Sequence, residues 1–267
     1  MTTFQAIVLG LIQGLTEFLP ISSSAHLSLA PVLFGWKDPG LAFDVALHFG
    51  TLIAVLWYFR KQWADLIVAA GGIIKTRKVD TIEKKRVVFL ILATIPGAIG
   101  GVLLEEKAET VFRAPVLTAW TLIVMGVILW AVDRVSAQDR PLATMRWLDA
   151  LLIGLAQVVA LVPGVSRSGS TITAGRALRL DRQSAAVFSF LMSMPITAAA
   201  VLMKGTEVLQ TDGVTAQVIA GVLAAGISSW LAIAILLRYV SRHSYGIFAL
   251  YRVILGAAVL LILQMRA

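Results

Sequence analysis

Six long apolar segments constrain the fold of this 267-residue chain more than any other feature of its sequence. They cover residues 41–60, 86–104, 114–133, 184–203, 215–238 and 246–265. A helix needs about 20 apolar residues to cross the hydrocarbon core of a bilayer. The chain is 58% apolar and only 14% charged, which excludes an ordinary water-soluble domain. The sequence therefore predicts an all-α integral membrane protein, a single membrane domain over residues 1–267.

Two further apolar segments, residues 3–33 and 147–181, are interrupted in the middle by proline, glycine and serine. Each half is too short to cross a bilayer. Irregular backbone at membrane depth is tolerated only where protein or a water-filled cavity covers it. We therefore expect two re-entrant helical hairpins, each entering and leaving on the same side of the membrane.

The two interrupted segments are also copies of each other. An offset of 144 residues places Gly10 on Gly154, Leu11 on Leu155, Gln13 on Gln157, Ser22 on Ser166 and Ser24 on Ser168. Each half, about 1–135 and about 145–267, then holds one hairpin and three crossings. Since three is odd, the second half starts on the opposite face. The sequence predicts an inverted-topology repeat of six transmembrane helices plus two hairpins, a plan common among proteins that handle charged substrates in the membrane.

Positive charge indicates the orientation. The chain has a net charge of +8, and eight of its 23 Lys and Arg residues lie between Arg60 and Arg86. We interpret this charge as loop charge that orients a membrane protein, with no nucleic-acid partner. The basic face becomes cytoplasmic, both termini lie outside, and the first hairpin opens outward. Cysteine is absent, which excludes disulfides and thiolate metal sites.

The second hairpin places Arg167 inside an apolar segment, where a guanidinium costs ~2.5 kcal/mol or more. Its planar fork of donors suits a phosphate group. Its neighbours are hydroxyl residues and glycines that allow close approach: Gly164, Ser166, Ser168, Gly169, Ser170 and Thr171. The alternative is a structural salt bridge from Arg167 to Glu17. A second arginine at membrane depth, Arg252, is interpreted as a brace between the hairpins.

The first hairpin carries different chemistry. Gln13 and Glu17 are four residues apart and share a helical face. After the break at Pro20 follow Ser22, Ser23, Ser24 and His26. A serine becomes a nucleophile when an adjacent base, usually histidine, takes its proton. With Arg167 opposite to neutralise the transferring group, these residues form the minimal set for a phosphatase. The alternative is that Ser23 or Ser24 only caps a helix.

Elsewhere, Asp44 and His48 share a helical face. We interpret them as a packed, mutually hydrogen-bonded pair in preference to a second catalytic dyad.

Both hairpins match the signatures of a known family. Residues 13–20 fit the (Glu/Gln)-x-x-x-Glu signature of the undecaprenyl-diphosphate phosphatases, bacterial membrane enzymes also linked to bacitracin resistance. Residues 163–171 fit that family's Pro-Gly-x-Ser-Arg-Ser-x-x-Thr signature at every fixed position. The chain resembles this family over its whole length.

The resemblance implies removal of the terminal phosphate from undecaprenyl (polyprenyl) diphosphate, which recycles a lipid carrier for cell-wall peptidoglycan synthesis. It implies a bacterial cytoplasmic (inner) membrane protein whose active site opens toward the exterior or periplasm. It also implies Ser23 as nucleophile, His26 as acid/base and Arg167 as phosphate clamp, with Glu17 binding a divalent cation (Mg²⁺ or Ca²⁺) or assisting proton transfer. The phosphate-binding residues would be Gln13, Ser22, Ser24, Gly164, Ser166, Ser168 and Thr171.

Several alternatives stay open. Ser23 and His26 both remain candidates for the attacking group, and the cation and a homodimer are undecided. Gln13, an amide where a second carboxylate is also accepted, weakens the case for a tightly held metal. A transporter or flippase of polyprenyl phosphate is the second function class, because inverted repeats suit alternating access. A type-2 phosphatidic acid phosphatase would need a histidine soon after the Ser-Arg pair, and none follows until His243.

Overall fold

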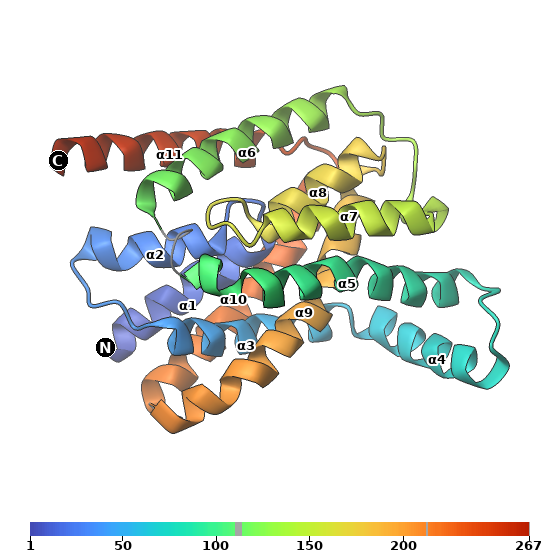
Figure 1. Cartoon of the computed structure of the whole chain (residues 1–267), viewed down its shortest axis with the longest axis horizontal. Helices are drawn as coiled ribbons and strands as arrows, with labels where there is room; N and C mark the ends of the chain where they lie inside the picture. Colours follow the sequence, from blue (N-terminus) through green and yellow to red (C-terminus); the bar gives the residue numbers. More distant parts are fainter. Residues whose placement is uncertain (110–113, 212, 267) are drawn as a thin grey trace.

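The computed structural model describes residues 1–109, 114–211 and 213–266 (Figure 1). These residues form eleven α-helices and one short 3₁₀ helix, with no β-strand in the described ranges. The helices are α1 (Thr3–Phe18), α2 (Ser23–Phe34), α3 (Leu41–Tyr58), α4 (Arg60–Thr76), α5 (Ile82–Glu109), α6 (Pro115–Val135), α7 (Trp147–Val159), α8 (Arg167–Ala177), α9 (Arg182–Thr211), α10 (Ala216–Val240) and α11 (Gly246–Arg266), and the 3₁₀ helix is Leu142–Thr144. The all-α prediction is confirmed.

Five of these helices are long and apolar enough to cross a membrane, judged by length and composition. They are α5 over Ile82–Leu104, α6, α9 over Arg182–Gly205, α10, and α11 over Gly246–Met265. The remaining predicted segment, residues 41–60, corresponds to α3, which ends at Tyr58, and the chain then bends by 81° into α4. If the bent pair of α3 and α4 is counted as one span, the number of candidate spans is six. The chain is thus a multi-pass membrane protein with five or six candidate spans.

Helix α4 is a feature that the sequence analysis missed, because it treated residues 60–86 as a charged connection. Leu66 and Ala69 are buried, while Arg60 and Lys61 are exposed, so one face of α4 packs against the protein. An amphipathic helix can bury its apolar face against the protein and leave its charged ends exposed.

The two interrupted segments each fold into two helices joined by a turn, as predicted: α1 with α2, and α7 with α8. Helix α1 packs against α10, and α7 packs against α5. Both contacts need a glycine. A Cβ atom on Gly10 would lie 2.3 Å from the Gly221 carbonyl oxygen, and one on Gly154 would lie 2.5 Å from that of Ala93. The residues paired by the 144-residue offset thus make the same kind of contact in both halves.

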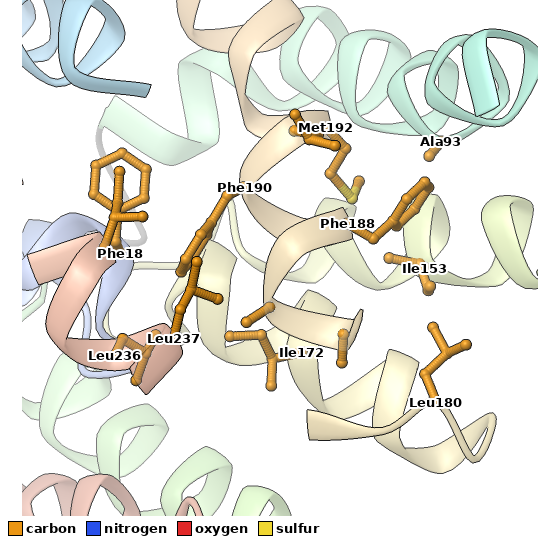
Figure 2. Close-up of a cluster of buried hydrophobic side chains, with 14 of the residues drawn as sticks. Phe18, Ala93, Ile153, Ile172, Leu180, Phe188, Phe190, Met192, Leu236 and Leu237 are labelled. Atoms are coloured by element: carbon orange, nitrogen blue, oxygen red, sulfur yellow. The ribbon is translucent and has the colours of Figure 1, made fainter. Parts of the chain in front are cut away.

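A core of aromatic and aliphatic side chains packs around the C-terminal end of α1 (Figure 2). The ring of Phe18, the last residue of α1, packs edge-on against Phe190 of α9, with ring centroids 5.2 Å apart. Ile172 of α8 belongs to the same buried cluster. This cluster therefore links α1, α8 and α9 directly beside the turn that follows Phe18.

A buried polar network fixes the other end of α8. The carboxylate of Asp133 on α6 accepts hydrogen bonds from Nε of Arg176 (2.8 Å), Nε of Arg182 (2.9 Å) and the backbone N–H of Tyr245 (3.0 Å). Arg176 is completely buried. Since a buried charge is costly unless paired, this network ties α6, α8, α9 and the start of α11 together.

The connection before α7 is held in a similar way. Nη2 of Arg140 donates to Oδ2 of Asp149 over 2.6 Å. This hydrogen bond raises the pKa of Arg140 above its ordinary value, so that the guanidinium stays charged.

Candidate active site

Two serine turns of the same shape begin α2 and α8. Ser22 (φ 75°) and Ser166 (φ 72°) are both in a positive-φ conformation that costs an L-residue about 1–2 kcal/mol. Each is the N-cap of its helix, and its Oγ accepts from the backbone N–H three residues on, in Ala25 and Gly169. The Oγ of Ser22 also lies 3.2 Å from the Oγ of Ser24, and the Oγ of Ser166 lies 3.2 Å from that of Ser168. The two serine turns, which the 144-residue offset aligns, thus have the same backbone geometry.

The two turns touch each other. The hydroxyl of Ser168, on α8, donates to the backbone carbonyl oxygens of Glu17 (3.2 Å) and Leu19 (3.1 Å). Residues about 150 positions apart in the chain are therefore in direct contact, as the single-site prediction requires. Because α2 begins at Ser23 and α8 at Arg167, two helix N-termini meet here, and each contributes partial positive charge.

Arg252 of α11 donates hydrogen bonds to both turns. Its Nη1 donates to the carbonyl of Pro20 (3.2 Å), and its Nη2 donates to the carbonyls of Gly164 (2.8 Å) and Val165 (2.9 Å). The side chain is completely buried. The predicted bracing role of Arg252 agrees with this geometry, since all its acceptors are backbone oxygens.

Glu17 is the centre of the side-chain cluster. Its Oε1 accepts from Nη2 of Arg167 at 2.5 Å, and its Oε2 accepts from Oγ of Ser23 at 2.7 Å and from Nε2 of Gln13 at 3.1 Å. Nε2 of His48 lies 3.7 Å from Oε2. The ion pair between Arg167 and Glu17, weighed above as an alternative to phosphate binding, is therefore present. The other terminal nitrogen of Arg167, Nη1, is buried without an acceptor in the part of the chain that the structure describes.

His26 is held at both ring nitrogens, and neither contact is to Ser23. Nδ1 lies 2.7 Å from the carbonyl oxygen of Ser22, and Nε2 lies 2.6 Å from the hydroxyl of Tyr251 on α11. The two rings are parallel within 6°. The hydroxyl of Ser23 is instead bonded to Glu17, so the carboxylate, and not the imidazole, is in place to take its proton.

The remaining predicted residues differ in solvent exposure and in their contacts. Ser24 is exposed, whereas Ser166 and Thr171 are buried. Thr171 donates to the carbonyl of Arg167 (2.8 Å) and contacts the hydroxyl of Ser189 on α9 (2.7 Å). Gly164 (φ 88°) packs so closely that a Cβ would lie 2.1 Å from Oγ1 of Thr121.

A cavity of about 420 Å³ opens at the first turn. Its polar lining includes Ser23, Ser24 and His48. Apolar side chains of α2 and α11 form much of the rest: Leu27, Leu29, Val32, Leu33, Val259, Ile262 and Leu263. Glu17 and Arg167 are reached from this cavity through Ser23, since Ser23 binds Glu17 and Glu17 binds Arg167.

The side chains that the structure describes do not form a metal site built from protein ligands alone. Within the described residues no group of three His, Cys, Asp or Glu side chains could hold a metal ion. Glu17, the predicted ligand, already has both oxygens engaged by Arg167, Ser23 and Gln13.

Two residues at the site escaped the sequence analysis. His48 bonds through Nδ1 to the backbone carbonyl of Asp44 at 2.8 Å and turns Nε2 toward Glu17. The helical spacing of Asp44 and His48 was the available signal, but it was interpreted as packing. Tyr251 directly precedes Arg252, but nothing in the sequence connects it to His26.

Comparison with known proteins gives consistent matches. The profile of the family described as bacitracin resistance protein BacA matches residues 6–258. The undecaprenyl-diphosphatase of Gemmatimonas aurantiaca is 61% identical over 266 residues, and that of Moorella thermoacetica is 51% identical over 267; each alignment covers 100% of both chains. The undecaprenyl-diphosphatase of Myxococcus xanthus is 43% identical over 267 residues, 99% of this chain and 90% of the relative.

Proposed function

Because the chain belongs to the bacitracin resistance protein BacA family, we propose that it is a membrane hydrolase that converts undecaprenyl diphosphate to the monophosphate and inorganic phosphate. The relatives that match it over its full length carry the name of that activity. The observation that carries the proposal is the cluster of Ser23, Glu17 and Arg167, which joins a hydroxyl, a carboxylate and a guanidinium from the two halves of the chain.

The cavity supports an amphiphilic substrate. A polyprenyl diphosphate has a highly charged head and an apolar tail. The hydroxyls of Ser23 and Ser24 line the same cavity as the apolar side chains of α2 and α11. The two helix N-termini favour the anionic head, and the apolar lining favours the prenyl chain.

In the proposed reaction the Oγ of Ser23 attacks the terminal phosphorus, and Glu17 takes the hydroxyl proton. The bond from phosphorus to the bridging oxygen breaks, and undecaprenyl monophosphate leaves. Water then hydrolyses the phosphoserine and releases inorganic phosphate, with His26 as acid/base for this second step. Ser23 is preferred over His26 as nucleophile because its hydroxyl lines the cavity and is bonded to a carboxylate that can take its proton, whereas His26 is not part of the cavity lining.

Arg167 is the proposed phosphate clamp. Its Nη1, which has no acceptor among the described residues, is a spare donor for a phosphate oxygen, while Nη2 holds Glu17. Charge that develops on the transferring group is stabilised most by donors already in place. Ser24 is proposed to contact the phosphates, whereas Gln13, Ser22, Gly164, Ser166, Ser168 and Thr171 shape the turns that hold the anion site.

We propose the finer architecture on the same grounds. The chain forms an inverted-topology repeat with six crossings, α1–α2 and α7–α8 being re-entrant hairpins. The matching serine turns and the matching contacts of α1 with α10 and α7 with α5 support this arrangement. The excess of Lys and Arg between Arg60 and Arg86 supports a cytoplasmic location for that segment, and hence a site that opens to the exterior.

A carrier that moves polyprenyl phosphate is the second candidate, because the repeat suits alternating access. Phosphate release from undecaprenyl diphosphate by the purified protein in detergent separates the two. A phosphatase releases phosphate, and Ser23→Ala lowers the rate more than about a thousandfold. Ser241→Ala is the matched control, since its hydroxyl bonds only the Arg238 carbonyl and Ser241 is not part of the cavity lining. A Ser23→Ala protein with unaltered turnover would rule out the proposed nucleophile, and a wild-type protein without turnover would favour the carrier.

A further inference from the structure

The hydrogen bond between Tyr251 and His26 joins residues 225 positions apart at the edge of the site. A backbone carbonyl can only accept a hydrogen bond, so the 2.7 Å contact with the Ser22 oxygen places a proton on Nδ1 of His26. In the neutral ring Nε2 then carries the lone pair, and the phenol of Tyr251 donates to it over 2.6 Å. The contact with the Ser22 carbonyl therefore selects the tautomer, and the contact with Tyr251 fixes the position of Nε2.

The position of the phenol is itself determined by the site. Tyr251 directly precedes Arg252, whose guanidinium is bonded to the carbonyls of Pro20, Gly164 and Val165 in the two turns. These hydrogen bonds therefore fix the position of α11 relative to both turns at the residue next to Tyr251. The rings of Tyr251 and His26 are parallel within 6°, with centroids 5.6 Å apart.

We propose that Tyr251 is a positioning residue, which fixes the orientation of the His26 ring for phosphoryl hydrolysis. This inference rests on the proposed phosphatase activity and on the part assigned to His26 in it. The lone pair of Nε2 is where the neutral imidazole can accept a proton, and the phenol of Tyr251 holds that nitrogen in place. Without the phenol, the ring is anchored only through Nδ1, and the position of Nε2 is no longer fixed.

Tyr251→Phe tests the proposal, because it removes the hydroxyl and keeps the ring. In steady-state phosphate release we expect kcat to fall about tenfold while KM stays within about twofold, since orientation of an acid/base group affects the chemical step. In protein labelled with ¹⁵N-histidine, the Nε2 signal of His26 should shift because this nitrogen loses its hydrogen-bond donor, while Nδ1 stays protonated. Tyr239→Phe is the matched control, because Tyr239 also stacks on a histidine, His243, at a ring distance of 4.6 Å.

A double-mutant cycle separates positioning from a mere loss of packing. In the His26→Ala background, Tyr251→Phe should cause no further loss of kcat. The proposal is overturned if Tyr251→Phe leaves both kcat and the His26 signals unchanged, or if its effect persists without His26. A wild-type protein that releases no phosphate would sink the proposed function instead, and the ¹⁵N signals would still test whether Tyr251 binds Nε2 and orients the ring of His26.

Discussion

Gln13 and Gln157 are aligned by the 144-residue offset but have different surroundings. Both are buried. Nε2 of Gln13 donates to Glu17, whereas neither side-chain polar atom of Gln157 has a hydrogen-bond partner in the described structure. The residue that corresponds to Glu17 in the second half is Leu161, so no carboxylate is present there. Of these two glutamines, only Gln13 thus has a polar side-chain partner in the described structure.

This difference predicts opposite effects of one substitution. Gln13→Leu should lower kcat/KM at least about tenfold, because a hydrogen bond to a charged group is worth about 1.5–3 kcal/mol. Gln157→Leu should leave kcat/KM unchanged and raise Tm, because an unpartnered buried amide costs about 1–3 kcal/mol. Phosphate release and thermal unfolding of the purified variants measure both. An equal loss of activity in the two variants would contradict the assignment of a single site.

At the level of single residues, the sequence motifs predicted which residues belong to the site better than they predicted which of these residues bond to one another. The 144-residue offset paired Ser22 with Ser166, and the structure gives these two residues the same positive φ. The expected base for Ser23 was His26, yet Ser23 bonds Glu17. Side-chain direction decides this, and the residue that holds His26, Tyr251, comes from a helix whose position depends on the whole fold.

At the level of elements, α2 and α11 form the two apolar walls of the cavity next to Ser23. Ile262 and Leu263 line it from α11, while the neighbouring Leu261 is exposed on the outer surface and is absent from the lining. If the prenyl chain lies between these helices, substitutions at adjacent positions should behave differently.

We expect Ile262→Trp to raise KM for undecaprenyl diphosphate about tenfold, since overpacking a fitted apolar site costs about 1–3 kcal/mol. The same variant should hydrolyse a short-chain prenyl diphosphate at the wild-type rate, because a short chain does not reach Ile262. Leu261→Trp is the control and should change neither. Kinetics with the two substrates measure this, and equal losses on both would place the chain elsewhere.

The elements themselves were predictable to different degrees. Long apolar runs located α5, α6, α9, α10 and α11 to within a few residues, because the bilayer requires each to be apolar over about 20 positions. Proline, glycine and serine in the interrupted segments located the two turns. Helix α4 was missed because its charged ends resemble a loop, and the 81° bend before it has no sequence signal that we recognised.

At the level of the whole molecule, the proposed orientation in the membrane rests on the distribution of charge and can be tested directly. The chain contains no cysteine, so single cysteines can be added without removing any. Lys37 and Lys78 are both exposed. In intact cells, a membrane-impermeant maleimide should label Lys37→Cys, and it should label Lys78→Cys only after permeabilisation. The reverse pattern would turn the site toward the cytoplasm.

The central claim is that two turns, one from each half of the chain, form one phosphate site. An experimental structure of Ser23→Ala with undecaprenyl diphosphate bound tests it most directly. We predict the terminal phosphate within hydrogen-bond distance of Arg167 and of the Ser22–Ser24 turn, with the prenyl chain between α2 and α11. A diphosphate bound at any place where only one of the two turns can reach it would contradict the account.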